Sequence, residues 1–228
     1  MKSLKTNGLK RPTGQQMGTA DDSRQGQSFH RPIVAFDFDG TLTVRDSFIA
    51  FLAWRAGPMR FVTGLIRLAP AALAYLFHRD RGRLKAATAG IFLRGLSRNE
   101  IEASAVTFAE RSARRLLRPD AMRTWKRWQA QGARLVVVTA SPETLVAPFA
   151  RGLGAERLIG TRLAFDANDR FTGGFDGENC RGPEKVRRLH EAFGADLRLA
   201  AAYGDTGGDR EMLAIAQQPG FKVFHEKP

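Results

Sequence analysis

Three short apolar runs, each ended abruptly by polar residues, form the clearest pattern along this chain. They cover residues 33–36, 135–138 and 197–203. Continuous apolar runs of this length are typical of strands buried on both faces of a parallel sheet. Because the carboxyl ends of parallel strands lie along one edge of the sheet, we expect the polar residues that follow these runs to lie close together.

Helical periodicity precedes two of these runs, at residues 118–131 and 184–193. Residues 158–175 predict a β-hairpin with its turn at 168–169, and residues 221–224 predict a last strand. Right-handed crossovers place the helices on both faces of such a sheet. The predicted fold class is therefore α/β, with a doubly wound parallel sheet.

Two segments depart from this alternation. Residues 1–30 are rich in Gly, Gln, Ser, Thr and Lys and have no hydrophobic period, so a disordered basic tail is predicted. Residues 47–118 have a helical pattern almost throughout, which predicts an inserted all-helical cap subdomain. The catalytic core then consists of residues 31–46 and 119–228.

The net charge of +13 is concentrated in one part of the chain. Residues 55–127 contain 16 Lys and Arg but only 5 Asp and Glu. A basic segment within a more neutral chain indicates a surface for an anionic partner, such as acidic membrane lipid, nucleic acid or a phosphorylated substrate. The chain lacks the interleaved aromatic and basic residues of RNA-binding surfaces, so nucleic acid is not the expected partner.

Cysteine and histidine usage narrows the compartment and the chemistry. The single cysteine, Cys180, cannot form an intramolecular disulfide, and no secretory signal pattern is present, so we expect a cytoplasmic protein. The four histidines show no ligand spacing, and no transition metal is expected. Nothing in the sequence predicts an oligomeric state.

The polar residues after the apolar runs, with one lysine, form an ordered set. They are Asp37-Phe38-Asp39-Gly40-Thr41 after the first run, Thr139 after the second, Lys185 in a Gly-Pro-Glu-Lys segment, and Asp205 and Asp209 after the third. Together they resemble the four motifs of the haloacid dehalogenase superfamily, from about residue 33 to the C-terminus. The resemblance implies a magnesium-dependent phosphatase that acts on phosphate monoesters.

The chemistry explains why such a set is needed. A phosphate monoester is a dianion that repels an attacking carboxylate unless cationic charge neutralises its oxygens. Mg²⁺ supplies this charge and prefers octahedral oxygen ligands. The resemblance implies that Asp37 and Asp205 provide carboxylate ligands and that Asp39 provides its backbone carbonyl. Asp209 would lie in the ligand shell or just behind it.

The resemblance also assigns roles in catalysis. Asp37 would attack the phosphorus and form an aspartyl phosphate, and Asp39 would protonate the leaving alcohol and then activate water. Gly40 would permit the turn that brings Asp39 alongside Asp37. The remaining residues, namely Thr139, Lys185, Gly40 and Thr41, would bind the phosphoryl group.

The position of the helical insertion resembles that in subgroup IB of the superfamily. This subgroup includes phosphoserine, histidinol-phosphate and phosphatidylglycerophosphatase C types. Asp46 stands where phosphoserine phosphatases typically carry a glutamate, and Gly40 stands where they carry a serine. Both departures weigh against an amino-acid substrate.

The apolar stretch 61–77 contains Arg67 and Pro70 and falls short of the roughly 20 uninterrupted apolar residues needed to span a bilayer. It predicts either a buried pair of cap helices or a helix that lies at a membrane surface. Nearby basic residues include Arg79, Arg81 and Arg83, which suit an anionic amphiphile.

The favoured interpretation is a phosphatase acting on a lipid phosphate such as phosphatidylglycerophosphate, peripheral on the inner face of the membrane. A soluble-metabolite phosphatase is the alternative within enzymes. A non-catalytic regulatory or nucleic-acid-binding protein on the same fold is the alternative outside them.

Overall fold

A six-stranded sheet lies at the centre of residues 31–228, the part of the chain that the computed structural model describes. The strands are β1 (Ile33–Phe36), β2 (Arg134–Pro142), β3 (Arg157–Phe165), β4 (Phe171–Asp176), β5 (Leu199–Gly204) and β6 (Ala216–Phe221). Their order is β4-β3-β2-β1-β5-β6, and β4 alone pairs antiparallel within this sheet. The predicted doubly wound α/β fold is confirmed, with one antiparallel edge strand. The predicted tail lies outside the described residues.

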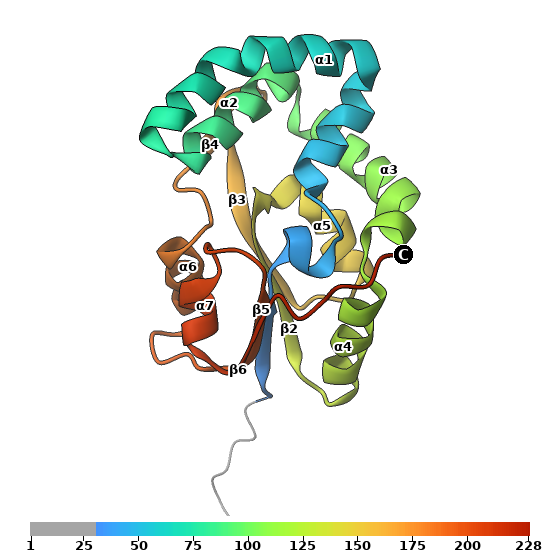
Figure 1. Cartoon of the computed structure of the whole chain (residues 1–228), viewed down its shortest axis with the longest axis vertical. Helices are drawn as coiled ribbons and strands as arrows, with labels where there is room; N and C mark the ends of the chain where they lie inside the picture. The colour runs from blue at the N-terminus through green and yellow to red at the C-terminus, as the bar shows by residue number, and fades with distance from the viewer. Residues whose placement is uncertain (1–30) are drawn as a thin grey trace, which may run out of the picture. The chain divides into compact units, whose positions relative to one another are not determined.

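Both faces of the sheet are covered by helices, which explains the continuous apolar runs. Four helices do this, namely α4 (Pro119–Ala130), α5 (Glu143–Gly152), α6 (Pro183–Phe193) and α7 (Arg210–Ala214). Figure 1 shows α4 and α5 on one face and α6 and α7 on the other. Val34 and Phe36 of β1 pack into the core of the first face, whereas Ala35 packs into the core of the second. Neither side of the strand meets water.

The prediction for the last strand is wrong in position. The strand is β6, which pairs parallel with β5 from Ala216 opposite Leu199 to Phe221 opposite Gly204. Its sequence, Ala-Gln-Gln-Pro-Gly-Phe, has little apolar character, because an edge strand is half exposed and tolerates proline. The more apolar segment that follows instead sends Phe224 back into the core, with its ring centroid 5.3 Å from that of Tyr203.

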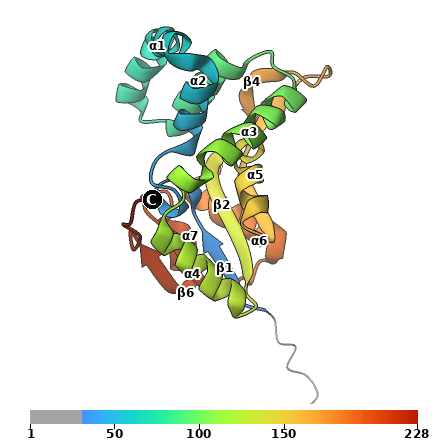
Figure 2. The ribbon, with the colours of Figure 1, turned by 90° about the vertical axis from the view of Figure 1, so that its right-hand side faces the viewer.

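The expected helical insertion lies between β1 and β2 as α1 (Ser47–His78), α2 (Arg81–Leu93) and α3 (Arg98–Leu116). These helices lie beyond the carboxyl ends of the central strands (Figure 2). An all-helical cap is thereby confirmed, while its division from the core at residues 47 and 118 stays a prediction. Lys85 of α2 donates a hydrogen bond to Ser141 of β2 over 3.0 Å, which links the cap to the core.

Helix α1 is broken at Gly57, whose φ of 73° is left-handed. Beyond this break, seven large apolar side chains between Met59 and Phe77 are exposed. The prediction of a buried helix pair is therefore wrong for this face, because α2 covers only one side of α1. The helix is also long and apolar enough to cross a membrane by length and composition alone, contrary to the sequence-based expectation.

Candidate active site

Asp37 lies at the point where the order of the strands in the sheet reverses. Its strand, β1, lies between β2 and β5, and such a switch point is where open α/β sheets bind ligands. The backbone N–H of Asp37 donates to the carbonyl of Tyr203 in β5 over 2.8 Å. The side chain is buried at the carboxyl edge of the sheet. β1 and its neighbouring strands therefore hold Asp37 in place at this edge of the sheet.

A tight turn at Phe38–Leu42 follows Asp37 and depends on Gly40. The φ of Gly40 is 85°, which disfavours any residue with a side chain. A Cβ atom at this position would also lie 2.2 Å from Oδ2 of Asp205. Both the backbone conformation and the close approach of the opposite loop therefore require glycine.

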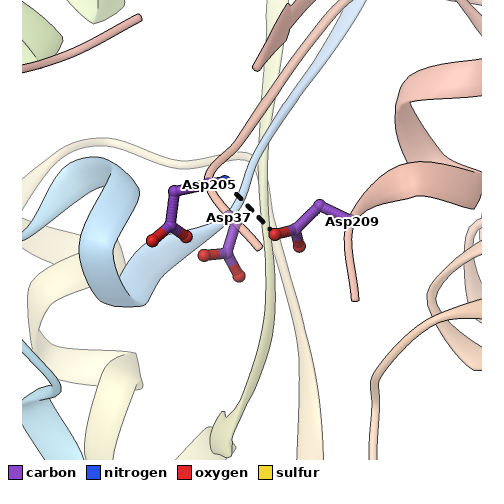
Figure 3. Close-up of side chains that lie close together, drawn as sticks. All are labelled: Asp37, Asp205 and Asp209. Atoms are coloured by element: carbon purple, nitrogen blue, oxygen red, sulfur yellow. Dashed lines mark hydrogen bonds between the residues drawn. The ribbon is translucent and has the colours of Figure 1, made fainter. Parts of the chain in front are cut away.

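Three carboxylates come together at this edge of the sheet. Asp37, Asp205 and Asp209 each place an oxygen within 4.8 Å of the others. Figure 3 shows Asp37 lying between the other two, which come from the loop after β5. Oxygen ligands of this kind suit a hard divalent cation such as Mg²⁺, so the donor set fits the ion that the sequence predicts.

Lys185, from the first turn of α6, provides a buried cation to this cluster. Its ammonium lies 2.6 Å from Oδ1 of Asp37 and 2.7 Å from Oδ1 of Asp209. The third N–H donates to the carbonyl of Val138 over 2.7 Å, so all three donors are used. Burial opposes the charge on Lys185, but the two carboxylates outweigh burial and raise its pKa above the usual value.

The two carboxylates that bind Lys185 have pKa values shifted in opposite directions. Burial raises the pKa of Asp37 to about 7, although Lys185 opposes the shift. Burial also acts against the charge of Asp209, yet Lys185 and the donors of Thr206 hold the pKa of Asp209 below its usual value. Oδ2 of Asp209 accepts the Thr206 backbone N–H over 2.9 Å and its hydroxyl over 3.0 Å. Asp209 thus keeps its charge, and Asp37 is the carboxylate that more readily takes a proton.

Asp39 is held by both the cap and the core. Its Oδ1 accepts the backbone N–H of Ser47, the first residue of α1, over 2.7 Å. Its Oδ2 accepts the hydroxyl of Ser141, which in turn accepts the ammonium of Lys85. Neither Ser141 nor Lys85 was predicted from the sequence as a residue of this site. Ser141 follows Thr139 by two residues and could have been noticed, but only the fold brings Lys85 from the cap to this position.

The two threonines of the predicted set have different surroundings. Thr139 lies within β2 rather than after it, and its buried hydroxyl oxygen accepts the N–H of Ser141 over 3.0 Å. That contact leaves the hydroxyl hydrogen to act as a donor. Thr41 instead donates to Oδ1 of Asp205 over 3.3 Å, so the structure places it beside the acidic cluster.

A cavity of about 480 Å³ lies between this edge of the sheet and the cap. Its core-side lining includes Asp37, Asp39, Gly40, Thr139, Lys185, Asp205 and Asp209, and its cap-side lining includes Asp46, Phe48, Ile49, Tyr75, Arg81, Leu84, Lys85 and Thr88. Of the three cap arginines singled out in the sequence, Arg81 lines the cavity. Arg79 ends α1 in a left-handed conformation, and Arg83 forms an exposed ion pair with Asp80 at 3.2 Å.

The fold and the site define the class of this protein. A family model for haloacid dehalogenase-like hydrolases matches residues 34–214, and the chain belongs to this family. The match takes in all of the residues at the sheet edge described above. The chain is therefore an enzyme of the hydrolase class, and the superfamily resemblance seen in the sequence is confirmed.

Individual relatives add detail without supplying an activity. The chain is 59% identical to Protein CicA of Caulobacter vibrioides over 204 residues, which cover 89% of this chain and 91% of that protein. A Bordetella pertussis protein of unknown function superposes with a TM-score of 0.70 at 25% identity, covering 83% and 88% of the two chains. A substrate-bound phosphoserine phosphatase superposes with a TM-score of 0.57 at 20% identity, covering 84% and 85%. This last likeness shows the fold alone.

Proposed function

We propose that this protein is a magnesium-dependent phosphomonoesterase in which Asp37 is the nucleophile. The observation that carries this proposal is the position of Asp37 at the switch point of the sheet, within one acidic cluster and 2.6 Å from a buried lysine. A carboxylate so placed can approach a phosphate only if cationic charge surrounds the phosphoryl oxygens. Lys185 supplies one positive charge, and the cluster supports a divalent cation.

The reaction has two displacements. An oxygen of Asp37 bonds to phosphorus while the bond from phosphorus to the ester oxygen breaks, and Asp39 gives a proton to the leaving alkoxide. Asp39 then takes a proton from water as the water oxygen attacks phosphorus, which breaks the aspartyl phosphate and releases inorganic phosphate. The hydrogen bonds from Ser47 and Ser141 hold Asp39 in place for both transfers.

The remaining residues bind the metal and the phosphate. Mg²⁺ would be held by the carboxylates of Asp37 and Asp205 and the backbone carbonyl of Asp39, and it would neutralise charge on the phosphoryl group. Both oxygens of Asp209 already accept hydrogen bonds, which favours a supporting position behind the metal. Thr139 would donate its hydroxyl to a phosphoryl oxygen, with Gly40 and Thr41 shaping the loop around it.

The lining of the cavity favours an amphiphilic substrate. Its cap side combines apolar side chains, such as Phe48 and Leu84, with the cations Arg81 and Lys85. This combination suits a lipid phosphate such as phosphatidylglycerophosphate, whose leaving group carries further negative charge. The cap-side Asp46 favours the second candidate, a soluble metabolite phosphate with a cationic group. We propose a cytoplasmic enzyme that works at the inner face of the membrane.

The assignment of Asp37 as the nucleophile is tested by one substitution and a matched control. Asp37→Asn is nearly isosteric and should abolish hydrolysis of p-nitrophenyl phosphate while leaving the circular dichroism spectrum unchanged. Asp196→Asn, an exposed aspartate in the same chain, serves as the matched control. Wild-type rates for Asp37→Asn in excess magnesium would overturn the mechanism.

The metal assignment needs its own experiment. Activity should disappear on chelation with EDTA and return on addition of magnesium. Asp205→Asn should increase the magnesium concentration needed for half-maximal activity, because it weakens a direct ligand. A panel of phosphatidylglycerophosphate in detergent micelles, phosphoserine and histidinol phosphate then separates the substrate candidates by their kcat/KM values.

A further inference from the structure

The second part of α1, residues 58–78, has two apolar faces, and only one of them is covered. We call this segment the arm. Its inner face packs on α2, where the rings of Phe61 and Phe92 stack with centroids 5.5 Å apart. Gly64 is buried there, and a Cβ atom on it would lie 2.2 Å from the ring of Phe92. The arm is therefore firmly attached to the cap along one side.

The outer face of the arm is apolar and exposed. Its large side chains recur at intervals of three and four residues and so lie on one side of the helix; they are Met59, Val62, Leu65, Ile66, Leu73, Leu76 and Phe77. Met59 and Phe77, one near each end, are 83% and 77% exposed. An apolar stripe that follows a whole helix is uncommon on a soluble monomer and marks a surface that binds something.

The charges around this stripe identify an anionic partner. Arg60 and Arg67 are exposed on the arm itself, and Arg79 is exposed where it ends. Residues 47–99 contain nine Lys and Arg, whereas Asp80 is their one acidic residue. An apolar face with arginines along one flank and at its end matches a bilayer that contains acidic phospholipid, because the apolar side chains enter the acyl boundary while the guanidinium groups reach the headgroups.

The geometry shows why the arm would lie on a membrane rather than cross it. A single span would place the two ends of the arm on opposite sides of the bilayer. Here both ends return to the same body, since Ser47 binds Asp39 before the arm and Lys85 binds Ser141 after it. The stacking of Phe61 on α2 also keeps the inner face away from lipid.

We propose that the outer face of the arm docks on acidic phospholipid bilayers. Docking would bring Tyr75 and Arg81, which line the cavity and flank the end of the arm, close to the level of the headgroups. The inference rests on the proposed function only for the purpose of docking, which is to give the enzyme access to a membrane-borne phosphate ester. The docking itself requires no catalysis.

The test is flotation of the full chain with vesicles, using phosphatidylcholine alone or mixed with phosphatidylglycerol. The wild type should float with the mixed vesicles and remain below with the neutral ones. Ile66→Gln combined with Leu73→Gln should reduce binding roughly a hundredfold, about tenfold for each apolar side chain withdrawn from lipid. Val106→Gln combined with Val223→Gln removes exposed apolar side chains elsewhere and should bind like the wild type.

A second pair of substitutions tests the charge. Arg60→Gln combined with Arg67→Gln should weaken binding about fivefold per arginine at low salt, and added salt should weaken wild-type binding in the same way. All of these variants should hydrolyse p-nitrophenyl phosphate at the wild-type rate, because none of the changed residues lines the cavity. A fold defect would instead depress that rate.

Three results would overturn the proposal. The first is a wild type that does not float with acidic vesicles, and the second is an Ile66 and Leu73 variant that floats as well as the wild type. The third is a concentration-dependent dimer in sedimentation that the same variant dissolves, which would assign the face to a second copy of the chain. Asp37→Asn should bind vesicles normally, so a failure of the proposed chemistry is distinguishable from a failure of docking.

Discussion

Replacing Lys185 with methionine would test whether one buried cation holds the acidic cluster together. Methionine is unbranched and of similar length, so the change removes the charge and its three hydrogen bonds with little change in shape. Lys185 is 1% exposed, and its partners are Asp37, Asp209 and the carbonyl of Val138. The variant would leave two carboxylates in the interior without this partner.

The expected loss of stability follows from this geometry. Breaking a buried ion pair by removing one partner costs about 3–5 kcal/mol. The pKa of Asp37, already raised to about 7 by burial, should rise further, so that Asp37 takes up a proton. This protonation keeps the loss of stability near the lower end of that range. A carboxyl group whose folded-state pKa is raised contributes stability when protonated, and this contribution is lost as pH rises through the folded value. The variant should therefore be weakest above pH 7.

Thermal unfolding followed by circular dichroism in EDTA measures this effect. At about 2–4 °C per kcal/mol for a chain of this size, the midpoint should fall by roughly 6–12 °C on the alkaline side of pH 7 and by less at about pH 6. Magnesium should raise the midpoint of Lys185→Met more than that of the wild type, because it replaces the missing positive charge. Lys126→Met, an exposed lysine on α4, is the control. A midpoint for Lys185→Met within about 2 °C of the wild type in alkaline EDTA would refute the reasoning.

Two further predictions concern protons at the site. Asp39→Asn should lower the rate for an alkyl phosphate by about 10²–10⁴-fold but affect p-nitrophenyl phosphate far less, because p-nitrophenolate needs no proton to leave; equal losses would contradict the role of Asp39. Magnesium affinity, measured by calorimetry, should weaken by about tenfold per pH unit below the Asp37 pKa of about 7, since the metal must displace the proton, and should level off above it. An affinity that does not change with pH would count against Asp37 as a ligand.

The buried strands of the sheet and the edge at which the site lies could be predicted from the sequence. Residues 33–36 and 135–138 are apolar throughout because both faces of β1 and β2 are buried, and this pattern is local enough to read along the chain. The turn after β1 was equally legible, since the left-handed conformation at position 40 favours glycine. The order of the strands then brings Asp37, Asp205 and Asp209 to one edge.

The contacts among the polar residues, and the covering of the apolar ones, follow from the tertiary structure and could not be predicted from the sequence. Lys185 bonds to Asp37 across 148 positions of sequence, and Lys85 reaches Ser141 from the helical insertion. The arm has apolar residues on two faces, and a periodicity gives no sign of which face a neighbouring helix will cover. β6 pairs with β5 through its backbone, so its side chains show little of the apolar pattern that predicts a strand. Burial and contact depend on the packing of distant segments, which no local pattern encodes.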